Sequence, residues 1–148
     1  KKYDYKNFIV KLNDATEIEK LNIKFDKILL DVPCSGLGVL RKKPEKIYSI
    51  TSNNIKELKK LQQKIFDSAY SSLKDGGYIV YSTCTFIKNE NTNNVQSFLK
   101  KYENLEVEKV EIPDNIFIKK DEFGGIYITH ENIYSDGFYI IKFRKKIL

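Results

Sequence analysis

Asp31-Val32-Pro33-Cys34-Ser35-Gly36-Leu37-Gly38 is the stretch from which the fold of this 148-residue chain is best predicted. The apolar run Ile28-Leu29-Leu30 precedes it, which is typical of a short strand buried on both faces of a sheet. Pro33 cannot continue such a strand, and the two glycines favour a tight loop. Open α/β sheets carry their ligands at the carboxyl ends of strands. The loop, with its acid, thiol and hydroxyl, is therefore a candidate functional site.

A second loop of the same kind follows the next apolar run. Tyr78-Ile79-Val80-Tyr81 is β-prone, and it ends at Ser82-Thr83-Cys84-Thr85. Between the two loops, apolar residues recur at the helical interval, from a cap at Thr51 or Ser52 to a stop at Asp75-Gly76-Gly77. Strand, loop, helix, strand and loop in this order indicate a parallel crossover unit. Each cysteine thus directly follows a predicted strand.

The remaining segments complete a single predicted domain over residues 1–148. Residues 7–12 are typical of a short strand, the loop of residues 13–16 that follows carries Asp14, and a second helix is expected at about residues 89–102. Further strands are expected at residues 105–112, 126–128 and 137–143. No helix separates the last two, which favours a hairpin. The fold class is therefore α/β, with a mostly parallel sheet and an antiparallel edge hairpin.

The composition indicates an ordinary globular protein with a basic surface. Hydrophobic residues make up 41% and charged residues 31%, and no apolar run is long enough to span a bilayer, so we expect a cytoplasmic protein. The net charge of +6 favours a polyanionic partner, although a lysine-rich composition alone would give the same sum. Arg41-Lys42-Lys43, directly after the first loop, are the candidate phosphate contacts.

The two cysteines are the residues that most need a chemical explanation. Two thiols do not make a disulfide framework, and with His130 as the only histidine no metal site is expected. A thiol-disulfide function is disfavoured because there is no Cys-x-x-Cys pair. The glycine-rich G-x-G-x-x-G turn of dinucleotide-binding sheets is also absent from the sequence.

The two cysteine loops resemble the paired cysteine motifs of the Sun/Fmu-type RNA cytosine-5 methyltransferases. The first motif is Asp31-Val32-Pro33-Cys34-Ser35-Gly36 with the following Gly38-Val39-Leu40-Arg41-Lys42-Lys43-Pro44, and the second is Tyr81-Ser82-Thr83-Cys84-Thr85. The similarity extends to Glu90-Asn91 and to Asp136-Gly137-Phe138. It covers nearly the whole chain, from about Phe25 to Phe143, in the order of the family.

The resemblance implies a Rossmann-like fold that uses S-adenosylmethionine to methylate cytosine in ribosomal or transfer RNA. Cytosine C5 is a poor nucleophile, and a thiolate that adds at C6 makes it reactive. By the resemblance, Cys84 is that nucleophile, Cys34 helps to release the product, and Asp31 binds the edge of the base. The residues alone leave the choice of nucleophile open, because DNA cytosine-5 methyltransferases attack with the cysteine of a Pro-Cys pair.

The resemblance also implies where the cofactor lies. Asp14, Asp31 and Pro33 are the candidate cofactor contacts, and Arg41, Lys42 and Lys43 the candidate RNA contacts. The family's first strands, with their glycine-rich cofactor loop, would precede Lys1. We therefore expect the carboxyl-terminal portion of a catalytic domain, with weak or no cofactor binding by this chain alone. The alternative is a non-catalytic RNA-binding or scaffold fragment.

Overall fold

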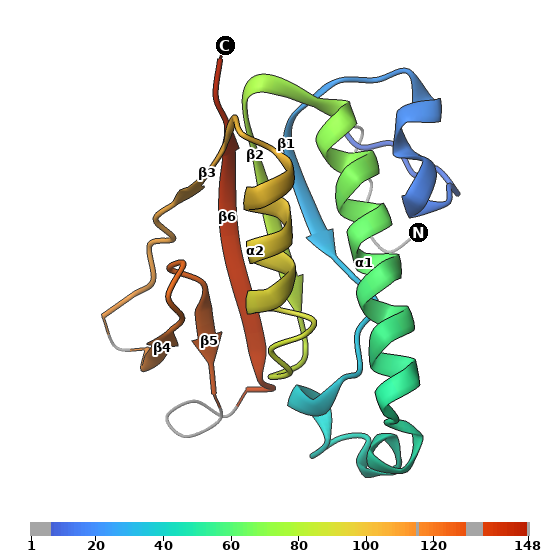
Figure 1. The fold of residues 1–148 in the computed structure, drawn as a ribbon, viewed down its shortest axis with the longest axis vertical. Coiled ribbons are helices and arrows are strands. Elements are labelled where there is room, and N and C mark those ends of the chain that lie inside the picture. The colour runs from blue at the N-terminus through green and yellow to red at the C-terminus, as the bar shows by residue number, and fades with distance from the viewer. Residues whose placement is uncertain (1–6, 115, 130–134, 148) are drawn as a thin grey trace.

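Two parallel strands joined by a long helix carry both cysteine loops. In the computed structural model, which describes residues 7–114, 116–129 and 135–147, β1 (Phe25–Asp31) pairs in parallel with β2 (Leu73–Thr83). The last pair in the register is Asp31 with Ser82, so both strands end at the same edge of the sheet. Helix α1 (Ser52–Ser72) connects them, and the Thr51 side chain caps it as predicted (Figure 1).

The rest of the sheet is antiparallel. The strand order is β1-β2-β6-β5-β4, in which β6 (Phe138–Lys145), β5 (Ile126–Ile128) and β4 (Ile118–Lys120) follow β2. A further strand, β3 (Leu105–Glu108), pairs with the carboxyl-terminal half of β6. The predicted hairpin of β5 and β6 is confirmed. The α/β fold class is also confirmed, although parallel pairing among the described strands is confined to β1 and β2.

Both α-helices cover the same face of the sheet. Helix α2 (Thr92–Lys101) follows β2 and lies beside α1 (Figure 1). Between the helices, the rings of Phe66 and Phe98 stack with centroids 3.7 Å apart, and Phe143 of β6 meets both edge-on. Leu29, on the other face of β1, is 71% exposed. The core that positions the site is therefore one-sided.

The strand expected at residues 7–12 is not formed. Phe8, Ile9, Val10 and Leu12 are exposed, and the short helix η1 (Ala15–Leu21) follows them and packs on α1. The prediction is wrong because a strand needs a partner as well as a pattern. β1 is the end strand of the sheet, and no described segment pairs with its outer edge.

Other boundaries differ by a few residues. α2 begins at Thr92 rather than at 89, because residues 87–91 form a turn in which the Asn91 N–H bonds the Ile87 carbonyl. β2 already begins at Leu73, so the predicted stop at Asp75-Gly76-Gly77 lies inside the strand segment. β3 ends at Glu108, and β4 was not predicted. His130 lies outside the described residues.

None of the helices formed by the described residues is long and apolar enough to cross a membrane.

Candidate functional site

The two cysteine side chains meet where β1 and β2 end. Their Sγ atoms are 3.0 Å apart, and the backbone N–H of Cys84 donates to the Cys34 sulfur at 3.2 Å. Both thiols are free and partly buried. The sequence thus correctly indicated two thiols after neighbouring strands, and the structure adds that they are in direct contact.

This contact shifts the pKa values of the two thiols in opposite directions. The hydrogen bond from Cys34 lowers the pKa of the Cys84 thiol, and the positive charge of Lys46 acts in the same direction against partial burial. The pKa of Cys34 is raised, first by its hydrogen bond to Cys84 and then by desolvation. Cys84 is therefore the thiol that ionises more readily, and Cys34 the one that retains its proton.

Gly38 ties the first cysteine loop to the second. Its N–H donates to the Cys84 carbonyl at 2.8 Å, and its own carbonyl accepts from the Gly137 N–H at 2.8 Å. A Cβ atom at Gly38 would lie 2.1 Å from the Gly137 oxygen, so only glycine fits between these two backbone segments. A second link joins the hydroxyls of Ser35 and Thr85, which are 2.7 Å apart.

Asp31 lies at the same edge of the sheet as the thiols. Its side chain is exposed, and the Ser82 hydroxyl donates to its Oδ1 atom at 3.4 Å. Its negative charge is close enough to the Cys84 thiol to oppose the lowering of that thiol's pKa. The predicted acid and both predicted thiols are thus brought together.

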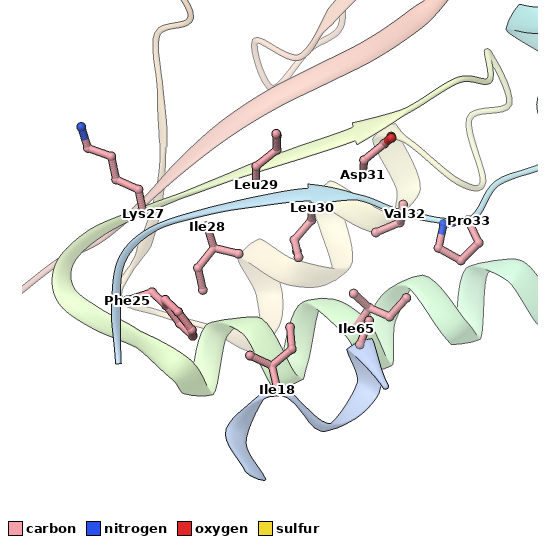
Figure 2. A pocket seen from close by; sticks show the side chains of 11 residues that line it. Ile18, Phe25, Lys27, Ile28, Leu29, Leu30, Asp31, Val32, Pro33 and Ile65 are labelled. Atoms are coloured by element: carbon pink, nitrogen blue, oxygen red, sulfur yellow. The ribbon is translucent and has the colours of Figure 1, made fainter. Parts of the chain in front are cut away.

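A cavity of about 420 Å³ runs along the outer edge of β1. Figure 2 shows Ile28, Leu30 and Val32 pointing from β1 toward Ile18 and Ile65, while Asp31 points to the other face. Asp31 and Pro33 line the end of the cavity near the thiols. The cavity is apolar along most of its length, so it suits a weakly polar group.

Asp14 does not line this cavity, although its neighbour Ala15 does. Its carboxylate caps η1 by accepting from the backbone N–H and the hydroxyl of Thr16, both at 2.8 Å. These hydrogen bonds lower the pKa of Asp14. The structure therefore gives Asp14 a capping role at the end of the cavity.

The basic residues after the first loop are exposed, and they differ in their ion pairing. Lys42 forms an ion pair with Asp136 at 2.7 Å, whereas Arg41 and Lys43 extend into solvent. Tyr48, an aromatic residue of the same segment, is 89% exposed. This segment therefore presents cations and an aromatic ring beside the cysteine site.

Sequence reasoning missed two polar residues near the thiols. Gln62 lies on the buried face of α1 and bonds the Pro33 carbonyl at 2.9 Å. Its signal was a polar residue at a core position of the helical pattern, between Leu58 and Ile65. Lys46 acts on Cys84 by its charge, and no sequence spacing indicated this. Among the described residues no group of three or more His, Cys, Asp or Glu side chains is placed to bind a metal.

Comparisons with known proteins show the family to which the chain is similar. A family model described as 16S rRNA methyltransferase RsmB/F matches residues 1–144. Ribosomal RNA small subunit methyltransferase F of Shewanella piezotolerans is 37% identical over 125 residues, which are 82% of this chain and 26% of that protein. The probable ribosomal RNA small subunit methyltransferase B of Bacillus subtilis is 33% identical over 84% of this chain and 28% of its own length. The chain thus spans about a quarter of these relatives.

Solved structures give the same result for the fold. NSun6 from Pyrococcus horikoshii with SFG has a TM-score of 0.83 at 32% identity, over 97% of this chain and 36% of that chain. A methyltransferase homolog from the same organism has a TM-score of 0.73 at 28% identity, over 90% of this chain and 43% of that chain. The described fold is therefore part of a Rossmann-like methyltransferase fold.

Proposed function

The chain belongs to the 16S rRNA methyltransferase RsmB/F family, and from this premise we propose that it is the carboxyl-terminal part of the catalytic domain of an RNA (cytosine-5) methyltransferase. The observation that carries the proposal is the contact of two thiols at 3.0 Å, beside an acid and at the carboxyl ends of adjacent parallel strands. Ribosomal RNA is the favoured substrate and transfer RNA the alternative. From an RNA substrate of this kind we infer a cytoplasmic location.

In the proposed reaction Cys84 is the nucleophile. Its thiolate adds to C6 of the cytosine and forms a C–S bond, which moves electron density to C5. After C5 has received the methyl group, release requires that a base such as water takes the C5 proton. The electrons of that C–H bond then restore the C5–C6 double bond, and the C–S bond breaks with Cys84 leaving as a thiolate. The lowered pKa of Cys84 favours the addition, and it equally makes the thiolate a good leaving group. The Cys34 thiol donates a hydrogen bond to the departing Cys84 thiolate, and Asp31 binds the edge of the base.

S-adenosylmethionine supplies the methyl group when bound, and the cavity along β1 fits part of it. Its apolar walls suit the adenine ring, with Asp31 and Pro33 at the end that faces the thiols. Both bonds from Thr16 go to the Oδ1 atom of Asp14, so its Oδ2 atom would be the one to contact the cofactor. The NSun6 structure holds SFG, an analogue of S-adenosylmethionine, which supports this cofactor for the family. We expect weak or no cofactor binding by this chain alone, and calorimetric binding at micromolar affinity would contradict that.

RNA would approach across the segment that follows the first cysteine loop. Arg41 and Lys43 are exposed and would neutralise phosphates, and Lys42 would contribute less because Asp136 already pairs with it. The exposed ring of Tyr48 would stack on an unpaired base next to the target.

Trapping of the covalent intermediate tests the assignment of the two thiols. In the complete protein, supplied with cofactor and RNA substrate, Cys34→Ala should accumulate a protein–RNA adduct that survives denaturing electrophoresis. Cys84→Ala should form none. An adduct in the Cys84→Ala protein would reverse the two roles. If neither variant nor the wild type forms an adduct or methylates RNA, the non-catalytic RNA-binding alternative holds instead.

A further inference from the structure

Two consecutive residues, Glu90 and Asn91, each contact one of the cysteine loops. Both lie in the turn between β2 and α2, and both have 0% of their surface exposed. Fully buried polar side chains persist in proteins when their hydrogen bonds are made. What these two side chains bind is therefore informative.

Glu90 holds the Cys34 loop. Its Oε2 atom accepts from the backbone N–H of Ser35 at 3.0 Å and from Gln62 Nε2 at 2.9 Å. Gln62 Nε2 also donates to the Pro33 carbonyl at 2.9 Å. The peptide groups on both sides of Cys34 are thus fixed by two buried side chains. The other carboxyl oxygen, Oε1, is buried and has no hydrogen-bond partner among the described residues.

Asn91 holds the Cys84 loop in the same way. Its Oδ1 atom accepts from the Thr83 hydroxyl at 2.7 Å, and its Nδ2 donates to the Thr85 carbonyl at 2.9 Å. Residues on both sides of Cys84 are therefore fixed by one amide. Because Glu90 and Asn91 are consecutive residues of one turn, the two cysteine loops are held by the same short segment.

We propose that Glu90 and Asn91 form a positioning element that sets the distance between the Cys34 and Cys84 thiols. Neither side chain contacts a sulfur atom in a described hydrogen bond, so they act through the backbone of the two loops. The catalytic meaning of this inference rests on the proposed function, which it deepens. Its test needs only the two thiols of this chain.

A trivalent arsenical measures the distance between two thiols. Phenylarsine oxide forms two As–S bonds and releases one water, and it binds tightly only when both sulfurs reach the same arsenic atom. The wild-type chain should form a one-to-one complex with it, as seen by intact-mass spectrometry and by protection of both cysteines from alkylation. Cys84→Ala, which leaves one thiol, gives the baseline. If the wild-type chain bound the arsenical no more tightly than Cys84→Ala does, the proposal would be overturned.

Substitutions of Glu90 separate its contacts from its charge. Glu90→Ala removes the acceptor for Ser35 and should weaken arsenical binding at least about tenfold. In Glu90→Gln the amide oxygen takes the place of Oε2 and keeps both hydrogen bonds, because Oε1 has no partner to lose. This variant should bind like the wild type. Equal loss in both variants would overturn the proposal, because the charge and not the contact would then matter.

Asn91→Asp is the second variant, because it leaves no cavity. The carboxylate still accepts from Thr83 but cannot donate to the Thr85 carbonyl, so arsenical binding should again fall at least about tenfold.

Thr92→Val is the matched control. Thr92 is the next buried residue, but its hydroxyl contacts Asp121 and Tyr127, away from the cysteines. The control should lose stability but bind the arsenical as tightly as the wild type does. If Thr92→Val lost as much arsenical binding as Asn91→Asp, the proposal would be overturned.

Discussion

The Cys84 sulfur lies 3.0 Å from the Cys34 sulfur, a distance at which one thiol can donate a hydrogen bond to the other. The partner that accepts is stabilised as a thiolate, and the partner that donates is stabilised as a thiol. Lys46 adds positive charge near Cys84, whereas burial acts more strongly on Cys34. The pair is therefore polarised before any substrate binds.

Removal of Cys34 should make Cys84 less reactive near neutral pH. The pKa of Cys84 is lowered to about 7, so its alkylation by iodoacetamide should rise with pH through a midpoint near that value. In Cys34→Ala the main cause of the lowering is lost, and the midpoint should move up toward the usual value of about 8.5. The measurement is the alkylation rate of Cys84 from pH 5.5 to about 10, followed by mass spectrometry.

Cys34→Ser is the control for that experiment, because its hydroxyl still donates and the shift should be smaller. Lys46→Gln tests the second cause and should also move the midpoint upward. If Cys34→Ala leaves the midpoint unchanged, the Cys34 hydrogen bond is not what activates Cys84.

Gly38→Ala should both destabilise the chain and disturb the thiol pair. A methyl group there meets the Gly137 oxygen at 2.1 Å and the Cys84 oxygen at 2.9 Å, and both are backbone atoms that cannot rotate away. We expect a loss of about 1–3 kcal/mol in the free energy of unfolding, as for other overpacked sites, measured by urea titration. Arsenical binding should fall as well.

Gly76→Ala is the matched control for Gly38. It is strained by its backbone, with φ at +77°, but a Cβ there makes only ordinary contacts with Ile147, far from the thiols in the fold. It should lose stability and keep normal arsenical binding. Equal arsenical binding by both variants would mean that Gly38 does not hold the Cys84 loop.

The three basic residues after the first loop should differ in their contribution to RNA binding. Each phosphate contact adds about 0.7 to the slope of log affinity against log salt for a single strand. Arg41→Gln and Lys43→Gln should each reduce this slope by about that amount, and Lys42→Gln by less because of its ion pair with Asp136. Fluorescence anisotropy with a labelled oligoribonucleotide at several salt concentrations measures it. Equal slopes for all variants and the wild type would exclude these contacts.

Both cysteine loops and the helix between them could be predicted because local patterns determine them. Pro33 ends an apolar run, and the α1 residues repeat at the helical interval from a cap at Thr51, which the structure confirms. The direct contact of the thiols could not be predicted in this way. It depends on the register that pairs Asp31 with Ser82, which is not visible in a single sequence.

The failed prediction at residues 7–12 has a different cause. The residue pattern of a strand was present, but a short segment forms a strand only where it pairs, and residues 7–12 do not pair with the free outer edge of β1. Glu90 and Asn91 are an intermediate case. The sequence showed that Glu90 and Asn91 belong to the family motif. It did not show that each forms hydrogen bonds with a different cysteine loop, because that depends on the turn that buries both side chains.

The exposed apolar residues near the start of the described chain should cause self-association. Phe8, Ile9, Val10 and Leu12 are between 58% and 104% exposed, and the outer edge of β1 offers unpaired backbone groups beside an apolar cavity. Apolar patches and free strand edges are typical association sites. Sedimentation velocity should therefore show species larger than a monomer whose fraction grows with concentration.

The double substitution Ile9→Lys and Leu12→Lys should reduce that fraction, because a charge on an exposed segment opposes pairing. Ile147→Lys, at a residue 75% exposed near the other end of the chain, is the control and should leave it unchanged. A wild-type chain that sediments as a single monomer at all concentrations would show that these surfaces do not drive association.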